Sequence, residues 1–469
     1  MAATQKTSTP IRVLVAEFLL ASASAANGVA PSMLMEAEAM LSALLTDIAG
    51  LPIVQTTVLL SDDSAARLAV SDTKSSKLFD NVRILRSELS PQSLSNLLDS
   101  VSPHAAFDAV FLIAPECDGV LVSLLKVVQS QRRSLIRSFN LDWQLAEIFA
   151  DKRQTAAWLQ YHGIPTIPTR TINDSTAEAF RVAAQLDQAQ NVNRIFVRPS
   201  FDPEPVVPAN PRSRAPALER TARRLLPPDS TPEAGASVQC VPRQEPRNKL
   251  HSARSSSSRG QTTKNGPQTE ANSESSKLAV LKPRDGAGSE GVQIVPLTED
   301  FETLPQQCSD DDRWLLQPYM PGLACSVGFI GGGAHRSTTI LPPARQQILA
   351  SEGRLTYHGG QVPCESTIAD RIAPVAQMLA TMLGSFDGYV GADLLVNLSA
   401  QENSLSSVLV VEINPRLCTS YVGYRALAKD NLAEWLFQQN HERSIRWTSQ
   451  IVTFSASGRI APHKSPESE

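Results

Sequence analysis

The residues best suited to chemistry lie toward the C-terminus, in the segment VEINPR at 411–416. One residue separates Glu412 from Asn414, so on a strand both side chains point to the same face. Carboxylate and amide oxygens on one face suit a hard cation such as Mg²⁺, which often shares its coordination with phosphates. Arg416 lies two residues after Asn414, so in an extended chain its side chain points to the same face, where it offers a planar donor for a phosphate or an oxyanion. The segment predicts a metal and phosphate site; the alternative is a Glu412–Arg416 salt bridge ahead of a turn.

A second carboxylate is expected beside this segment. Asp393 lies in the apolar run 388–396, and this run and 407–411 both have the composition of buried strands. A buried carboxylate without a partner is destabilising, so Asp393 needs a cation or a hydrogen-bond donor. If the two strands pair, Asp393 can share one Mg²⁺ ion with Glu412 and Asn414.

A glycine-rich loop upstream supplies the groups that phosphate binding requires. An apolar strand ends at Lys282, and Gly286, Gly288 and Gly291 follow it before a second strand at 292–295. Glycines allow backbone N–H groups to converge on phosphate oxygens, and a lysine adds a positive charge. The loop has neither the Walker A ending nor the helix that follows a Rossmann loop. It predicts a hairpin that covers phosphates, or else a plain glycine-rich hairpin.

A second unit of the chain is expected to begin near residue 151, and a segment further along could contact a nucleotide base. Asp151-Lys152 begins a predicted helix that stops at Gly163. The segment 314–322 is predicted to be a strand that runs into a short connection, with Gln317 and Met320 placed near an adenine base. A simple edge strand followed by a turn explains the same residues equally well.

The composition is that of a globular chain of 469 residues with 42% hydrophobic residues and a formal charge of −4, which predicts about two or three domains. A charge so close to zero gives no indication of a nucleic-acid or membrane partner. The six cysteines are scattered, so we expect a reduced, cytoplasmic protein without a zinc site or disulfide framework. Residues 13–23 imitate a secretory signal, but Glu17 interrupts their apolar core and favours a buried first strand.

Strands and helices alternate in the first part of the chain, which predicts a small open parallel sheet. The expected strands are 11–18, 54–60 and 109–114, and the expected helices are 31–48 and 121–128, with a small-residue loop at 21–28. Ligands bind beyond the carboxyl ends of such strands, which is where Glu17 and Glu116 fall. Each of the two residues taken alone is more typical of a solvated loop acid.

The composition changes abruptly at 201–276, which is rich in Pro, Ser and Arg and shows no sustained periodicity. It has too few large apolar residues to offset the entropy of ordering, so we expect a disordered insertion. Its arginines could bind an anionic partner, although a solvated tether fits the composition better.

The order of these motifs resembles that of the ATP-grasp superfamily. The resemblance rests on Asp151-Lys152, Lys282-Pro283 with its glycine loop, 317–322, 391–393 and 412–416. Within the superfamily, IAPE at 113–116 and NPRLCTSYVGYR at 414–425 resemble the tyramine–glutamate ligase group of methanofuran-type cofactor synthesis. Within these motifs two features depart from the family pattern: residues 22–26 lack a glycine cluster, and Cys418 stands where Thr is expected. The insertion at 201–276 is also foreign to the compact family.

The resemblance implies an α/β protein with an ATP-grasp fold and a long disordered insertion. The implied regions are an N-terminal open parallel-sheet domain at 11–140, an ATP-grasp domain at 141–440, the insertion at 201–276 and a C-terminal tail at 441–469. The ATP-grasp domain would comprise a lid lobe at about 165–200 and 277–318 and a C-terminal lobe at about 319–440, with ATP between the two.

The resemblance also implies roles for individual residues. Lys152 and Lys282 would hold phosphates, and Arg416 would face the γ-phosphate or the tetrahedral intermediate, so that Arg416 and Lys282 are the catalytic candidates. The remaining candidates are Gly286, Gly288, Gly291, Gln317 and Met320 for the nucleotide, and Asp393, Glu412 and Asn414 for Mg²⁺ or Mn²⁺.

The implied activity is that of a carboxylate–amine ligase, in which ATP converts a carboxylate to an acyl phosphate that an amine captures. Arg416 and Arg425 would bind an amino-acid carboxylate, and Tyr421 and Tyr424 would stack on an aromatic amine, which points to glutamate and tyramine; core packing is the alternative for the two tyrosines. The expected partners are therefore ATP, an amino acid and an amine, and a homo-oligomer is an open alternative to a monomer. An ATP-binding regulatory or scaffold protein and another ATP-grasp reaction remain as alternatives.

Overall fold

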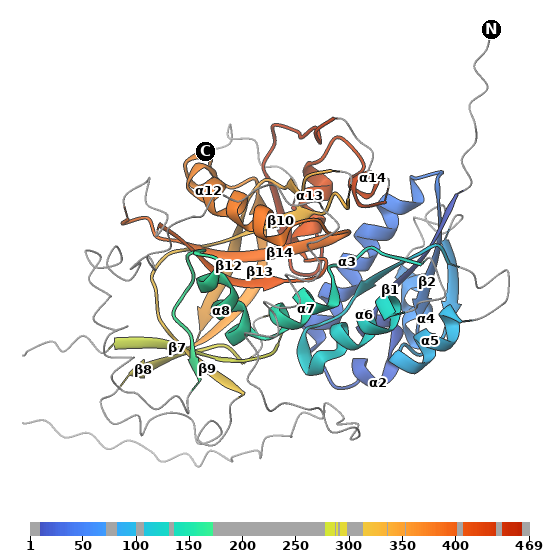
Figure 1. Ribbon diagram of the computed structural model, residues 1–469, viewed down its shortest axis with the longest axis horizontal. Helices are drawn as coiled ribbons and strands as arrows, with labels where there is room; N and C mark the ends of the chain where they lie inside the picture. Colours follow the sequence, from blue (N-terminus) through green and yellow to red (C-terminus); the bar gives the residue numbers. More distant parts are fainter. Residues whose placement is uncertain are drawn as a thin grey trace, which may run out of the picture.

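The computed structural model shows two closely packed units (Figure 1). It describes residues 10–71, 82–99, 107–130, 136–171, 277–286, 288, 291–297, 313–334, 336–351, 353–400, 407–437 and 443–461. The segment 201–276, where a disordered insertion is expected, lies outside the described residues. Among the helices that are described, none combines the length and apolar character needed to cross a membrane.

The N-terminal unit is an open parallel sheet with helices on both faces, as expected from the alternating pattern. In the described residues the strand order is β3-β2-β1-β4-β5. The strands are β1 (Ile11–Glu17), β2 (Val54–Leu60), β3 (Val82–Arg86), β4 (Ala109–Ile113) and β5 (Arg137–Ser138). The connecting helices are α1 (Phe18–Ala21), α2 (Ala23–Ala26), α3 (Pro31–Ala49), α4 (Asp62–Ser71), α5 (Pro91–Leu98), the 3₁₀ turn η1 (Cys117–Gly119) and α6 (Val120–Ser130).

The central strand β1 explains why both faces of this sheet are covered. Its side chains alternate between faces: Val13 and Val15 belong to the core that contains α3, whereas Leu14 and Ala16 belong to the core that contains α5 and α6. Burial on both faces produces the continuous apolar run that imitates a signal segment. A small-residue loop was expected after β1, at 21–28. This prediction was wrong for most of the stretch, because α1 ends at Ala21 and α2 follows it.

The second unit is built on a large, mostly antiparallel sheet. Over the described part of the chain, the order along the sheet is β15-β14-β10-β12-β13-β8-β7-β9-β6, with β11 beside β10 and β16 beside β13. The strands are β6 (Arg170–Thr171), β7 (Lys277–Pro283), β8 (Gln293–Leu297), β9 (Trp314–Pro318), β10 (Leu323–Ile330), β11 (Thr339–Ile340), β12 (Ala344–Ser351), β13 (Arg354–Val362), β14 (Tyr389–Val396), β15 (Val408–Asn414) and β16 (Val452–Ser455). The helices are α7 (Trp143–Ala150), α8 (Lys152–Tyr161), α12 (Ser366–Leu383), α13 (Ser420–Leu427) and α14 (Leu432–Phe437).

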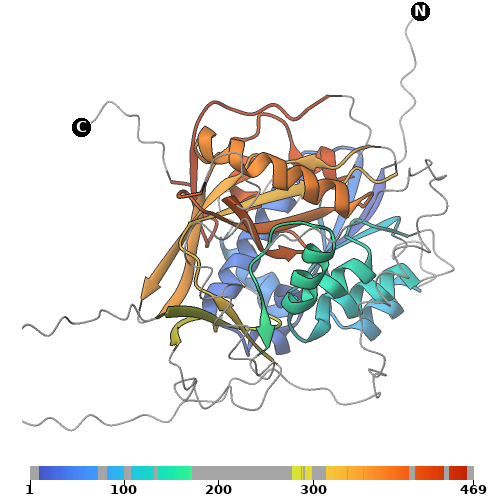
Figure 2. The same cartoon turned by 60° about the vertical axis from the view of Figure 1, so that its left-hand side comes forward.

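Strands β7, β8 and β9 form a flap at one end of this sheet. Figures 1 and 2 show them at the edge of the molecule, away from the parallel sheet of the N-terminal unit. A single residue pair, Arg354 with Gln293, joins β8 to β13 in register, whereas β12 and β13 pair along most of their length. The C-terminal tail expected at 441–469 is corrected in part, because it contributes β16, whose Phe454 is buried.

Helix α3 joins the two units because α13 and α14 pack on it within one continuous hydrophobic core (Figure 1). Asp47 of α3 is the polar centre of this contact. It accepts hydrogen bonds from the Tyr421 hydroxyl at 2.8 Å and from Arg425 Nε at 2.7 Å, while its backbone oxygen accepts one from Asn431 Nδ2 at 2.6 Å. The N-terminal unit is thereby held against the segment that follows the expected metal site.

Candidate active site

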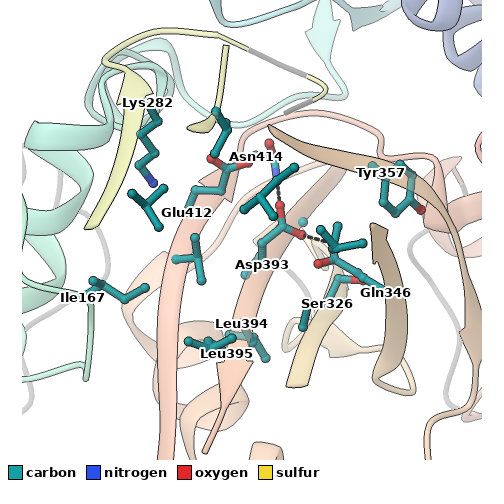
Figure 3. Close-up of a pocket in the computed structure, with 18 of the residues that line it drawn as sticks. Ile167, Lys282, Ser326, Gln346, Tyr357, Asp393, Leu394, Leu395, Glu412 and Asn414 are labelled. Carbon is teal, nitrogen blue, oxygen red and sulfur yellow. Dashed lines mark hydrogen bonds between the residues drawn. The ribbon is translucent and has the colours of Figure 1, made fainter. Parts of the chain in front are cut away.

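A cavity of about 510 Å³ lies between the flap and the pair of strands β14 and β15. Figure 3 shows Lys282 on one side of it and Glu412, Asp393 and Asn414 on the other. All but one of the residues expected to bind the nucleotide or the metal or to take part in catalysis line this cavity: Lys152, Lys282, Gly286, Gly288, Gln317, Met320, Asp393, Glu412, Asn414 and Arg416. The exception is Gly291, which does not line it.

Gly291 is instead a packing position within the flap. Its φ of +75° falls in the region that disfavours other residues. An added Cβ would lie 3.0 Å from Pro283 Cγ, so the turn also needs the missing side chain. Gly291 therefore shapes the hairpin rather than contacting the cavity.

The two carboxylates face each other across β14 and β15. These strands pair, as predicted, and the pairing is antiparallel with Asp393 directly opposite Glu412 and Gly391 opposite Asn414. Asp393 accepts hydrogen bonds from Gln346 Nε2 at 2.7 Å and Asn414 Nδ2 at 3.2 Å. Burial, and next the charge of Glu412, raises the pKa of Asp393 to about 8.

This donor set fits a divalent cation. Two carboxylates and an amide line one wall of the cavity on paired strands, so they offer several oxygen ligands to a single cation. The described residues hold no group of three or more His, Cys, Asp or Glu side chains that could hold a metal alone. A cation placed here would take further oxygen ligands from phosphate and water, as Mg²⁺ commonly does.

Two lysines face the carboxylates from the opposite side. Lys152 Nζ lies 3.8 Å from Glu412 Oε2 and donates a hydrogen bond to the Gly286 carbonyl at 2.7 Å. Lys282 is buried at 4% exposure, and this burial lowers its pKa to about 8 despite the nearby Glu412. Burial raises the pKa of Glu412, but the two lysines outweigh it, so the pKa lies below its usual value. The two lysines therefore favour the ionised form of the Glu412 carboxylate.

Helix α8 fixes Lys152 against the glycine loop. Asp151 caps the helix by accepting from the backbone N–H groups of Arg153 and Gln154 at 2.9 and 3.2 Å. The same carboxylate accepts hydrogen bonds from Arg284 at 2.6 and 2.8 Å, and the Lys152 N–H donates to the Arg284 carbonyl at 3.0 Å. The helix start and the loop are therefore positioned as one piece.

Arg416 connects this site to the N-terminal unit. Its Nε lies 2.9 Å from Glu116 Oε1, and its Nη2 donates to Glu116 Oε2 at 3.1 Å. The alternative pairing of Arg416 with Glu412 is therefore not the one that forms. Glu116 is 4% exposed, so its interpretation as a solvated loop acid was wrong; the ion pair compensates its burial.

Glu17 is likewise buried, at 2% exposure. Its interpretation as a solvated loop acid was therefore also wrong. Its carboxylate caps α1 by accepting from the Leu20 N–H at 2.8 Å. Burial raises the pKa of Glu17 to about 8, although the Leu20 N–H and the charge of Arg416 oppose this shift. The carboxyl group is therefore largely protonated near neutral pH in the folded protein.

This raised pKa gives a testable pH dependence. Between pH 4.5 and about 8 the folded state holds a Glu17 proton that the unfolded chain has lost, so stability falls as pH rises through this window and is steady above it. Glu17→Gln should remove this decline, because the amide oxygen still caps α1 without a charge. Urea unfolding near both ends of the window measures it; an equal decline in both proteins would contradict the assignment.

The wall expected to bind adenine is largely apolar. Gln317 and Met320 line it together with Val280, Ile294 and Ile167. The Gln317 side chain is occupied, because its Nε2 donates to Thr169 Oγ1 at 2.8 Å. An apolar slot with few polar groups is typical of a small-molecule site.

Several cavity residues were not identified from the sequence. Glu36 comes from α3 of the N-terminal unit, and Gln346 and Tyr357 come from the β12–β13 hairpin. Nothing in the spacing of Glu36 marks it, since acids are common on exposed helix faces. Gln346 and Tyr357 lie on β12 and β13. Which side chains of these strands are buried depends on how the two strands pair, so their sequences alone did not mark either residue.

Three residues expected to contact substrates do not. Tyr421 and Tyr424 are fully buried, and Arg425 pairs with Asp47 at 2.7 Å; none of them lines the cavity. Tyr421 and Tyr424 are three residues apart and face the core from one side of α13, where helical packing places them. The proposed stacking of these tyrosines on an amine was therefore wrong.

Cys418 lines the cavity but is unsuited to covalent chemistry. Burial raises its thiol pKa well above the usual range, so the thiolate is scarce. An added Cβ at Gly391 would lie 2.4 Å from Cys418 Sγ, which shows how closely β14 approaches this residue. Residues 22–26, the other departure from the family pattern, lie in and around α2 and do not line the cavity.

Comparison with known proteins agrees with this geometry. A family model described as an ATP-grasp domain matches residues 247–420. The protein carries an ATP-grasp domain. The match covers the glycine loop, the flap strands and the Asp393–Glu412 pair, which are the parts of the ATP-grasp domain that enclose the cavity.

Solved structures show the same ATP-grasp fold over most of the chain. A putative ATP-grasp superfamily protein from Archaeoglobus fulgidus is 14% identical with a TM-score of 0.50, over 94% of this chain and 92% of that one. The biotin carboxylase domain of Hydrogenobacter thermophilus 2-oxoglutarate carboxylase, solved with ADP, its magnesium salt and bicarbonate, is 12% identical with a TM-score of 0.51, over 95% and 74% of the two chains.

A curated relative matches part of the sequence. The tyramine–L-glutamate ligase of Methanocaldococcus fervens is 25% identical over 145 residues, which are 31% of this chain and 44% of that protein. The match therefore spans less than half of the relative's length.

Proposed function

We propose that the protein is an ADP-forming carboxylate–amine ligase that uses ATP and a divalent cation. The observation that carries this proposal is one cavity in which Lys152 and Lys282 face the Asp393–Glu412 pair, with Asn414 beside it. Positive charge on one wall and oxygen ligands on the other suit a triphosphate and its cation. The ATP-grasp domain supports ATP as the nucleotide, and the oxygen donors fit Mg²⁺, or Mn²⁺ in its place.

In this proposal the flap strands β7, β8 and β9 form the lid, and β14 and β15 belong to the C-terminal lobe. Lys152 and Lys282 bind the phosphates, and the glycine loop covers them. Asp393, Glu412 and Asn414 would hold Mg²⁺, which neutralises charge on the transferring phosphoryl group. The lid excludes water from the acyl phosphate, which would otherwise hydrolyse.

The substrate carboxylate attacks the γ-phosphorus of ATP, and the bond to the β-phosphate oxygen breaks to release ADP. The amine then attacks the acyl carbon, and phosphate leaves with the bonding electron pair and takes up the proton that the amine loses. Arg416, held by Glu116, stands beside Asn414 where it can stabilise negative charge in both steps. No protein nucleophile is needed.

For the substrates we propose glutamate as the acid and tyramine as the amine. The tyramine–L-glutamate ligase of Methanocaldococcus fervens and the resemblance at 414–425 support this pair. The buried Tyr421 and Tyr424 do not contribute to the choice.

Coupled measurement of ADP release tests both levels of the proposal. We expect ADP release to require glutamate and tyramine together, with a product whose mass is that of the amide. Full activity with a small amino acid such as D-alanine as acceptor would reject tyramine and retain the ligase class. ADP release that no acid or amine stimulates would reject the ligase itself.

A further inference from the structure

The cavity has an acidic end that the ligase chemistry above does not use. Figure 3 shows Lys282, Glu412, Asp393 and then Tyr357 in succession across it. Glu36 also lines the cavity, and its Oε2 accepts a hydrogen bond from the Thr419 hydroxyl at 3.1 Å. Helix α3 of the N-terminal unit thus places a carboxylate in a site otherwise built by the ATP-grasp domain.

The surroundings leave the charge of Glu36 incompletely neutralised. The nearest guanidinium, Arg416, is engaged by Glu116 through both Nε and Nη2. Burial raises the pKa of Glu36 despite the Thr419 hydrogen bond and the charge of Arg416. A further cation next to Glu36 would therefore be stabilised.

An aromatic ring lines the same cavity as Glu36. It is that of Tyr357, whose pKa is raised well above the usual range by burial and next by the charge of Glu36. A carboxylate and the face of an aromatic ring both attract an ammonium group.

We propose that Glu36 binds the amine substrate in its ammonium form, with the Tyr357 ring packed beside it, and that the Glu36 carboxylate accepts the proton that the ammonium must lose before it attacks. This inference rests on the ligase function proposed above and assigns the acidic end of the cavity to the acceptor. Glutamate complements this end less well than a simple amine, because its two carboxylates outweigh its single ammonium group and leave it with a net negative charge beside Glu36. An amine with an aromatic body and without a carboxylate of its own, such as tyramine, complements both groups.

Kinetics of Glu36→Gln test this assignment. Loss of one charge-assisted contact should raise the KM for tyramine roughly 10- to 100-fold and leave the KM values for ATP and glutamate nearly unchanged. Glu38→Gln is the matched control, since it alters the same helix at a residue that does not line the cavity. Tyr357→Leu should raise the KM for tyramine a few-fold, and Tyr357→Phe should not.

Hydroxylamine separates recognition of the cation from the first chemical step. It is uncharged at neutral pH and traps acyl phosphates as hydroxamates, so Glu36→Gln should form glutamyl hydroxamate at the wild-type rate. An unchanged KM for tyramine, a raised KM for glutamate instead, or equal loss of hydroxamate and amide formation would each overturn the assignment. Absence of hydroxamate with the wild-type protein would overturn the ligase proposal and this inference with it.

Discussion

Glu412→Gln and Asp393→Asn are each expected to lower ADP formation by about a thousandfold or more while the protein remains folded. The carboxylates lie opposite each other on paired strands, and in the proposed mechanism they would supply the anionic ligands for the cation. Loss of either removes several kcal/mol of charge stabilisation from the transition state, which corresponds to several powers of ten in rate.

The substitutions themselves are mild. Gln and Asn keep the size of the side chain, and removing one of two like charges relieves repulsion within the pair. Asp370→Asn is a suitable control, because Asp370 is an exposed acid on α12 outside the cavity. Turnover close to the wild-type rate in both variants, with circular dichroism unchanged, would contradict the metal assignment.

Lys282→Met is expected to lower kcat by roughly 100- to 1000-fold, the usual effect of removing one preorganised group that stabilises transition-state charge. Lys282 is 4% exposed and points into the cavity toward Glu412 (Figure 3), so no surface cation can take its place easily. Met has a similar length and suits a buried position, so the fold should persist.

Steady-state kinetics and ATP binding together identify the cause of this loss. Lys126→Met is the matched control, because Lys126 is half-exposed and pairs with Glu147 at 2.7 Å on the N-terminal unit. If Lys282 binds phosphate, the Lys282 variant should also bind ATP more weakly. Equal kcat values in the Lys282 and Lys126 variants would contradict that role.

The strands that carry Asp393 and Glu412 could be predicted, because the residue patterns that indicate them lie within short stretches of sequence. Alternation on β15 places Glu412 and Asn414 on one face, and the apolar run around Asp393 indicated a neighbouring strand. The Gly286–Gly288 loop likewise follows directly from residue types that suit phosphate. Predictions of this kind depend only on residues that are close in sequence, so they do not require knowledge of how the units pack.

Contacts between the units could not be predicted in the same way. Glu116 and Arg416 are 300 residues apart, so only the docked fold shows that burial of one depends on the other. Glu36 could not be predicted as a site residue either. Its helix, α3, packs on α13, and only this packing shows that the polar face of α3 borders the cavity. The motif at 414–425 correctly marked the region, yet it did not distinguish Arg416, which lines the cavity, from Arg425, which holds Asp47.

The central claim is that a carboxylate is activated as an acyl phosphate, and transfer of an oxygen label tests it most directly. Glutamate labelled with ¹⁸O in its side-chain carboxylate would be incubated with the protein, ATP, Mg²⁺ and tyramine. Because the attacking carboxylate oxygen stays on phosphorus when the amine displaces phosphate, the account predicts inorganic phosphate that carries one ¹⁸O atom. Amide formation with unlabelled phosphate would contradict it.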